Sequence, residues 1–404
     1  MLPIRAFGRS ETGRRDNNED AFLLDEEHGL FAVADGMGGH AAGEVASRQA
    51  LESVRKSILG DWPRLRQIAA EGSARTGEVL RAAMTAAFRS ACAEVFRLGQ
   101  EDLRKSGMGT TCVAALVTTG RVAIGHVGDS RVYLRRGGEV HQLTEDHSLL
   151  AEQVRRGMLS AEEAASAPGK NILLRIIGPQ PDTQVDTLIV ELQPGDGLLL
   201  CSDGVHGELQ AMELSKYLGA PDPQAAAARL VEGALEQGGK DNATAVVVEV
   251  GDASESGDAT ERCETLRKIP LFEKLDYKQL LELVEISSTR RFEKGQTIVR
   301  EGEPGEEMFA IVSGRVQVTK AGVPLIELRK GGYFGELILF DGAPRSATVV
   351  AAEDTIAVAL EREGLSRLLK RDAELAVKLL WTMGRVMAGR LRSTTYSLSM
   401  GQQE

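Results

Sequence analysis

The run LFAVADG at residues 30–36 is an apolar stretch of strand length that ends in an aspartate and a glycine. Acidic residues also stand at the ends of other strand-like runs: Asp129, Asp203, Asp241 and the pair Glu19-Asp20. A single Asp-Gly pair is an ordinary turn signal. The recurrence indicates more, because carboxylates at the ends of neighbouring buried strands would converge at one end of a sheet.

Convergent carboxylates repel one another unless a cation neutralises them. Oxygen ligands without a nearby cluster of histidine or cysteine favour a hard ion, Mg²⁺ or Mn²⁺, over Zn²⁺. Two such ions about 3.5–4 Å apart can hold a bridging hydroxide and clamp a phosphoryl group. Arg15 lies four residues before Glu19. Its guanidinium could grip phosphate oxygens, although a lone arginine is more often a solvated surface residue.

The composition restricts the class of protein. The chain has 404 residues, enough for roughly two to three domains, and a net charge of −11 with 4% aromatic residues. An acidic chain poor in aromatics is a weak candidate for nucleic-acid binding. No apolar run approaches the ~18 residues of a membrane helix, and the N-terminus lacks a signal-peptide core. The four cysteines show neither metal spacing nor a disulfide framework. We therefore expect a cytoplasmic protein with no nucleic-acid or membrane partner.

A polar stretch, GDASESGDATER at residues 251–262, predicts a linker. We place domains at residues 1–250 and 264–404, with a linker at 251–263. The first domain mixes strands with helices expected at about 42–59 and 78–98, so its fold class is α+β. The second begins with a helical stretch at 277–286 and continues with short glycine-punctuated strands. It closes with a long helix around 376–391, which predicts a small β-roll with flanking helices.

Six segments occur in order along the first domain: GRRDNNED (13–20), VADGMGGH (33–40), GTT (109–111), GDSR (128–131), CSDG (201–204) and DNAT (241–244). Each is weak alone, but the ordered set closely resembles the metal-dependent Ser/Thr protein phosphatases of the 2C type. The resemblance covers residues 8 to about 250. It implies a four-layer αββα sandwich with a binuclear Mn²⁺ or Mg²⁺ centre and a phosphoprotein substrate.

The resemblance carries metal-binding roles to seven residues: Glu19, Asp20, Asp35, Gly36, Asp129, Asp203 and Asp241. It implies that Asp35 bridges both ions, that Gly36 binds through its carbonyl, and that Asp203 and Asp241 hold the first ion.

Glu19 would bind the second ion, largely through water, with Asp20 beside it. Asp129 together with Asp203 matches a third ion position. Arg15 would hold the substrate phosphate while a metal-bridging hydroxide attacks phosphorus in line, so we assign catalytic roles to Arg15, Asp35, Asp203 and Asp241.

Two departures from this family concern substrate handling. Met37 occupies the slot where animal members carry a histidine proposed as general acid, and His40 or a metal-bound water are the alternatives. The segment from Asp146 to Asp182 resembles the family's flap. Residues 167–171 within it have diverged, which leaves the substrate contacts open. His147 is interpreted as structural.

The segment FGELILFDGAPRSATV at residues 334–349 could cradle a phosphate through Arg345 and exposed backbone amides. A structural Arg–Glu pair at a turn is the alternative. The segment closely resembles the phosphate-binding cassette of cyclic-nucleotide-binding domains. The resemblance covers about residues 269–391. It implies that Arg345 pairs with the cyclic phosphate and Glu336 with the ribose hydroxyl, with further contacts from Gly335, Ser346 and Ala347.

The sequence thus predicts a phosphoserine/phosphothreonine phosphatase regulated by cAMP or cGMP. Ser346 occupies a position of this family where Ser or Thr often favours cGMP. Bacterial catabolite activator proteins also carry Ser there and bind cAMP, so we favour cAMP. The closing helix would act as a lid. It could also form the contact of a homodimer, and an ordinary amphipathic helix packed on its own roll is the alternative. Two other interpretations stay open. One is a catalytically weak, metal-containing scaffold with nucleotide-dependent binding; the other is a phosphatase whose second domain only docks partners.

Overall fold

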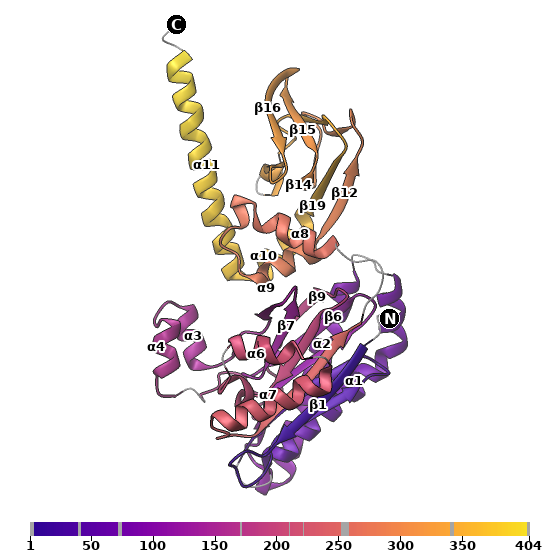
Figure 1. Cartoon of the computed structure of the whole chain (residues 1–404), viewed down its shortest axis with the longest axis vertical. Coiled ribbons are helices and arrows are strands. Elements are labelled where there is room, and N and C mark those ends of the chain that lie inside the picture. Colours follow the sequence, from indigo (N-terminus) through magenta and orange to yellow (C-terminus); the bar gives the residue numbers. More distant parts are fainter. Residues whose placement is uncertain are drawn as a thin grey trace. The chain divides into compact units, whose positions relative to one another are not determined.

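The computed structural model describes residues 4–38, 42–71, 75–169, 172–209, 211–220, 222–251, 258–339 and 343–401. The chain divides into two compact units, residues 1–255 and 256–404. Figure 1 gives the order of the elements along the chain.

Two antiparallel sheets form the centre of the first unit. One has the strand order β1-β11-β10-β7-β8, and the other β2-β3-β5-β6-β9 with β4 paired to β3. The strands are β1 Ile4–Glu11, β2 Asp20–Asp25, β3 Leu30–Met37, β4 Gly109–Thr110, β5 Cys112–Val117, β6 Arg121–Val127, β7 Arg131–Arg136, β8 Glu139–Gln142, β9 Asp186–Glu191, β10 Gly197–Cys201 and β11 Ala243–Val250.

Strand β3 shows how the sheets stack. Leu30, Ala32 and Ala34 join the core beneath α1 (Ala42–Glu71) and α2 (Thr76–Glu101). The alternate residues Phe31 and Val33 are equally buried, and β3 also contacts β10 and β11 of the other sheet. Because successive strand side chains point to opposite faces, β3 is buried between its helices and the second sheet.

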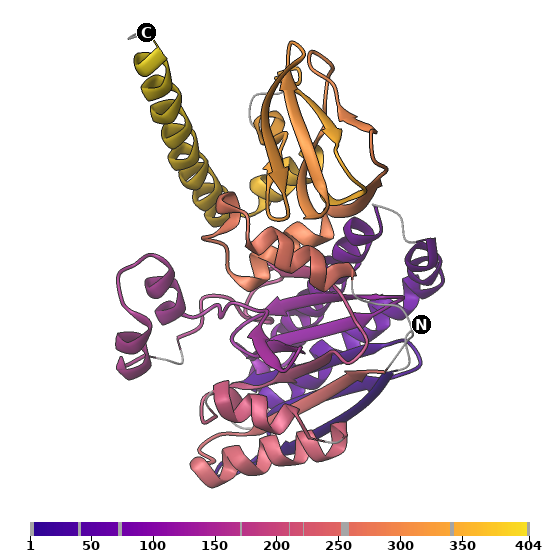
Figure 2. The ribbon, with the colours of Figure 1, turned by 45° about the horizontal axis from the view of Figure 1, so that its top comes forward.

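Helices α6 (Ala211–Leu218) and α7 (Pro223–Gln237) cover the outer face of the other sheet, as Figures 1 and 2 show. The predicted four-layer αββα sandwich is therefore confirmed. Helix α1 runs twelve residues beyond the predicted end at residue 59 because its buried positions continue at helical spacing to Leu65 and Ala69. The unit also contains η1 (Leu103–Lys105), α3 (Leu149–Arg155), α4 (Ala161–Ser166) and α5 (Asp203–His206).

The second unit contains two four-stranded antiparallel sheets, β12-β19-β14-β17 and β13-β18-β15-β16, which enclose a small apolar core (Figure 2). The strands are β12 Ser287–Phe292, β13 Thr297–Val299, β14 Glu307–Ser313, β15 Arg315–Lys320, β16 Val323–Arg329, β17 Tyr333–Phe334, β18 Thr348–Ala351 and β19 Thr355–Glu361. Helical segments α8 (Asp258–Arg267), η2 (Pro270–Phe272), α9 (Tyr277–Glu285), α10 (Arg362–Arg371) and α11 (Ala373–Gly401) flank this roll, and η3 (Glu336–Leu339) follows β17.

The predicted linker at 251–263 is too long at its C-terminal end, because α8 begins at Asp258. Arg262 is buried and donates to the carbonyl oxygens of Val284 and Ser287, at 3.0 and 2.8 Å. The composition of residues 258–262 resembles a linker because the residue that packs α8 against the end of α9 is charged, and not apolar.

Among the described residues, no helix combines the length and apolar character needed to span a bilayer.

Candidate functional site

Four of the acidic residues singled out from the sequence come from strand ends in both sheets of the first unit. Asp20 and Asp35 are cross-strand partners on β2 and β3. Asp203 opens α5 directly after β10, and Asp241 lies two residues before β11, the neighbour of β10. Residues separated by more than 200 positions in the sequence are therefore brought to one end of the sandwich.

The charges of these carboxylates act on one another. Burial and the charges of Asp20 and Asp203 raise the pKa of Asp35 well above its usual range, and Asp129 and Asp241 add to the effect. Burial, opposed by two hydroxyl hydrogen bonds, raises the pKa of Asp20 to about 7. Burial and the charge of Asp203 raise the pKa of Asp129 to about 7. A cluster of this kind resists full ionisation unless positive charge is supplied.

The donor atoms fit a hard divalent cation. Within the described residues, Oδ1 of Asp20 and Oδ1 of Asp203 are buried without a hydrogen-bond partner. The other oxygen of Asp20 accepts from Ser202 Oγ at 2.7 Å. No three Asp, Glu, His or Cys side chains of the described ranges form a metal-ion site by themselves, and the ligand set inferred from the sequence also uses the carbonyl of Gly36. Carboxylate and carbonyl oxygens are the ligands that Mg²⁺ and Mn²⁺ favour.

Gly36 and Glu19 belong to one tightly packed corner. The amide of Gly36 donates to the carbonyl of Glu19 at 3.2 Å, and a side chain at position 36 would collide with the carbonyl oxygens of Glu19 and Gly43. Only glycine admits this approach. Burial raises the pKa of Glu19, the charge of Arg15 opposes this, and the charge of Asp241 adds to it. The carboxylate of Glu19 therefore shares the electrostatic environment of the cluster.

Arg15 supplies positive charge at the edge of this cluster. Its Nη2 lies 2.5 Å from Oδ2 of Asp241, and the guanidinium is about half exposed. The hydrogen bond and charge of Asp241, followed by the charges of Asp203 and Asp35, raise the pKa of Arg15. An exposed guanidinium beside buried carboxylates is suited to gripping an anionic phosphate.

Asn242 holds the loop that carries Arg15 and Glu19, a role that sequence reasoning missed. Its Oδ1 accepts from the amide of Glu19 at 2.8 Å, while its Nδ2 donates to the carbonyls of Thr12 and Asn17 at 2.8 and 2.9 Å. The position next to Asp241 within DNAT was the available signal. A buried side-chain amide that satisfies three backbone groups fixes a loop firmly.

A second set of polar contacts fixes Asp35 and Asp129. Thr110 Oγ1 donates to the carbonyl of Asp35 at 2.8 Å, and Thr111 Oγ1 accepts from the amide of Asp35 at 3.0 Å. His206 Nε2 lies 2.9 Å from the carbonyl oxygen of Asp129. Burial and the nearby Arg131 lower the pKa of His206 to about 4, so the neutral ring donates this bond.

The structure describes some of the residues at which the sequence departs from the family pattern. Met37 ends β3 and is half-buried. His40, the alternative general acid, lies outside the described residues. The predicted flap contains the short helices α3 and α4, and its return segment, residues 172–178, is anchored by an antiparallel bridge between Thr110 and Ile177.

In the second unit, the cassette residues surround the guanidinium of Arg345. Nη1 of Arg345 is buried without a hydrogen-bond partner among the described residues. Burial lowers the pKa of Arg345, partly offset by Glu307. A side chain at Gly305 or at Gly335 would overlap the guanidinium, and Gly335 has φ +79°. The glycines therefore leave room for a buried cationic group, which fits an anion better than it fits a structural ion pair.

The other cassette residues differ in exposure. Glu336 is buried at the start of η3, Ser346 is exposed, and Ala347 packs against the core of the roll. The amide of Arg345 donates to the carbonyl of Glu303 at 2.9 Å, which joins the cassette to the 302–305 loop.

An αββα sandwich with buried carboxylates at its strand ends is the architecture of the metal-dependent protein phosphatases. Residues 7–237 match the family model described as Protein phosphatase 2C, and residues 289–372 match that of the Cyclic nucleotide-binding domain. The chain therefore belongs to the protein phosphatase 2C family, as a serine/threonine phosphatase that also carries a cyclic nucleotide-binding domain.

Named relatives agree with this assignment. The chain is 36% identical over 252 residues to the serine/threonine phosphatase stp of Listeria innocua, covering 61% of this chain and 96% of that protein. It is 35% identical over 252 residues to PstP of Mycobacterium tuberculosis, covering 62% of this chain and 46% of PstP. The crystal structure of the PstP catalytic domain in complex with two manganese ions matches with a TM-score of 0.54 at 33% identity, covering 62% of this chain and all of that one.

Proposed function

We propose that the first unit hydrolyses phosphoserine and phosphothreonine in proteins with Mn²⁺ or Mg²⁺ held by seven residues: Glu19, Asp20, Asp35, Gly36, Asp129, Asp203 and Asp241. The observation that carries the proposal is the pair of buried carboxylate oxygens, on Asp20 and Asp203, that have no donor among the described residues. The structure of PstP with two manganese ions supports two such ions. Asp129 beside Asp203 would provide for a third.

Bound there, the ions would supply the positive charge that neutralises the cluster and the Lewis acidity that activates water towards phosphorus. Arg15 would hold the phosphate at the exposed edge of the cluster and keep phosphorus in line with the attacking oxygen. Asn242 would keep the 12–19 loop, and hence Arg15, at a fixed distance from Asp241.

Manganese-dependent release of phosphate from a phosphothreonine peptide by the full chain tests this function. Asp203→Ala should lower the rate at least ~10³-fold, because removing a ligand removes stabilisation of the transition-state charge. Arg229→Ala, a surface change on α7, should leave the rate unchanged. A normal rate in Asp203→Ala with an unchanged melting temperature would refute the metal assignment. Absence of manganese-dependent turnover in the unaltered chain would instead favour the scaffold interpretation.

We also propose that the second unit binds a cyclic nucleotide through Arg345 and Glu336 and thereby regulates the phosphatase. Nη1 of Arg345 is buried with no hydrogen-bond partner in the described ranges, which supports an anionic ligand. Ser346 is exposed at the same cassette, and we favour cAMP over cGMP. Regulation requires that the nucleotide bind two states of the protein with different affinity. Titrating cAMP and cGMP separately during peptide hydrolysis tests both the regulation and the preference for cAMP. A hydrolysis rate that changes with neither nucleotide would favour a docking role for the second unit.

The exposed face of α11 supports the proposed homodimer. Val377, Leu380 and Trp381 are 66%, 58% and 71% exposed. Trp381 lines a groove of about 610 Å³ beside η2, and Gly384, one turn further on, leaves open space. A bulky aromatic next to a small residue on one helix face suits self-association of two copies of α11. Light scattering on the full chain should give twice the monomer mass, and Trp381→Glu should give the monomer.

A further inference from the structure

His147 stands where the chain leaves β8 for the flap, and it is bound at both its backbone and its ring to Gly128. The amide of His147 donates to the Gly128 carbonyl at 2.8 Å, and the amide of Gly128 donates to His147 Nδ1 at 3.1 Å. Since Nδ1 accepts a hydrogen bond, the proton of the neutral ring is on Nε2. Gly128 directly precedes Asp129, so His147 fixes the loop that carries a proposed metal ligand.

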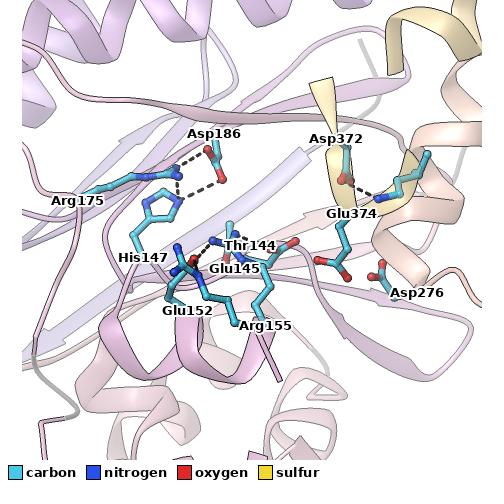
Figure 3. A network of polar contacts seen from close by, with 12 residues as sticks. Thr144, Glu145, His147, Glu152, Arg155, Arg175, Asp186, Asp276, Asp372 and Glu374 are labelled. Atoms are coloured by element: carbon cyan, nitrogen blue, oxygen red, sulfur yellow. Dashed lines mark hydrogen bonds and ion pairs between the residues drawn. The ribbon is translucent and has the colours of Figure 1, made fainter. Parts of the chain in front are cut away.

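The proton on Nε2 points to Asp186, the first residue of β9. The distance from His147 Nε2 to Asp186 Oδ2 is 3.2 Å, and Arg175 Nη1 donates to Asp186 Oδ1 at 2.8 Å. Figure 3 shows the three side chains pointing toward one another. Arg175 Nη1 also lies 3.1 Å from His147 Nε2. The carboxylate of Asp186 accepts from both of these nitrogens and therefore holds His147 together with Arg175, which belongs to the return segment of the flap.

The electrostatics of Asp186 are consistent with its contacts to His147 and Arg175. Burial by itself would raise the pKa of Asp186, but the hydrogen bond from His147 and the charge of Arg175 outweigh it and hold the pKa well below the usual range. His126 on β6 lies against the ring of His147, with 4.4 Å between ring centroids. The ring of His147 is thus held on its face as well as at both nitrogens.

The backbone of the return segment is bound to the same two places. The amide of Leu174 donates to the carbonyl of His147 at 2.7 Å, and Ile177 exchanges two hydrogen bonds of 2.9 Å with Thr110. Thr110 in turn donates to the carbonyl of Asp35. The segment 172–177 is therefore connected to the loops of both Asp129 and Asp35.

We propose that His147 and Asp186 are positioning residues that lock the flap's return segment to the loop carrying Asp129, so that the surface presented to a protein substrate keeps a fixed place beside the acidic cluster. The proposal rests on the phosphatase site proposed above. It assigns to the interaction of Arg175, His147 and Asp186 a role in holding protein substrates, not in the chemical step.

Hydrogen exchange and kinetics of the full chain test the lock. Asp186→Asn removes the charge that joins Arg175 to His147, and His147→Asn keeps an acceptor for Gly128 while removing the donor to Asp186. In both variants we expect the protection of the Leu174 amide to fall about tenfold. The KM for a phosphothreonine peptide should rise about fivefold or more while its kcat, and hydrolysis of p-nitrophenyl phosphate, change less than about twofold.

Arg155→Gln is the matched control, because it breaks the ion pair between the exposed Arg155 and Glu152 within the same flap and leaves the lock intact. Unchanged exchange at Leu174, or equal loss of activity on the peptide and the small substrate, would overturn the proposal. The exchange measurement needs no turnover, so it separates failure of the lock from failure of the phosphatase assignment. If Asp186→Asn does not fold, Arg175→Gln provides the same test, because it removes the positive charge on the other side of the contact.

Discussion

At the scale of single residues, the two candidate sites use opposite kinds of unsatisfied group. Counting only partners from the part of the chain that the structure describes, the first unit buries carboxylate oxygens without donors, at Asp20 and Asp203, and the second buries a guanidinium nitrogen without an acceptor, at Arg345. An unpaired polar group is costly in a protein interior unless a ligand completes it. Unpaired oxygens of this kind suit a cation and an unpaired guanidinium nitrogen suits an anion, which is the chemistry of the two proposed ligands.

Arg345→Ala should weaken cyclic-nucleotide binding by at least about 2 kcal/mol, because it removes a charge-assisted hydrogen bond made by a half-buried guanidinium. Isothermal titration calorimetry of the full chain would measure this. Arg329→Ala, at an exposed site on β16, is the control and should bind like the unaltered chain. Equal affinity in Arg345→Ala would show that the cassette does not hold the phosphate.

The raised pKa values of Asp20 and Asp129, both about 7, predict how stability depends on pH. A carboxyl with a raised folded-state pKa binds more protons in the folded than in the unfolded chain between its unfolded value near 4 and about 7. With divalent ions removed, the free energy of unfolding should therefore fall as the pH rises through that range. Urea unfolding with a chelator should show this slope, and excess Mn²⁺ should raise stability most at the upper end. Stability that rose with pH in the chelator would contradict the electrostatics.

At the scale of elements, one buried ion pair joins the two sheets. Arg136 on β7 binds Asp196 with two hydrogen bonds, of 2.9 and 2.6 Å, and donates to the carbonyl of Glu191 on β9 at 2.7 Å. Strand β7 belongs to one sheet and β9 to the other. The contact therefore fixes the two layers relative to each other at the turn before β10.

Asp196→Ala should lower the free energy of unfolding by about 3–5 kcal/mol, because it leaves the Arg136 charge buried and uncompensated. Urea unfolding of the full chain would measure the loss. Removing the exposed pair between Arg5 and Glu249 by Arg5→Gln should cost less than about 1 kcal/mol. Similar losses of unfolding free energy for the two variants would mean that burial does not determine how much the Arg136–Asp196 pair contributes to stability.

Much of the fold and of the acidic cluster was predictable, because each acidic residue lies within two residues of an apolar strand or at its end, and the pattern is local. The lock around His147 and the role of Asn242 were not predictable in this way. Asn242 acts on Thr12, Asn17 and Glu19, more than 220 positions away. Such a partner becomes visible only when the strands are paired. The helix starting at Asp258 was missed for a related reason, since its buried Arg262 resembles a linker residue.

At the scale of the whole molecule, the first unit corresponds in length to a complete relative, since 252 aligned residues span 96% of the Listeria phosphatase. A chain that ends at Val250 should therefore keep its manganese-dependent activity and lose any response to cyclic nucleotide. Peptide hydrolysis with and without cAMP would test both statements. A nucleotide response in the shortened chain would place the sensor within the first unit.

The antiparallel pairing of β1 with β11, from Ile4 opposite Val250 to Glu11 opposite Ala243, has a consequence for synthesis. The first strand of the catalytic unit can find its neighbour only after about the whole unit has left the ribosome, and Asp241 arrives just before that neighbour. A growing chain therefore cannot hydrolyse a phosphorylated substrate until β11 has been synthesised and has paired with β1. Activity in the cell would begin only when the catalytic unit is complete, with no partially active forms before it.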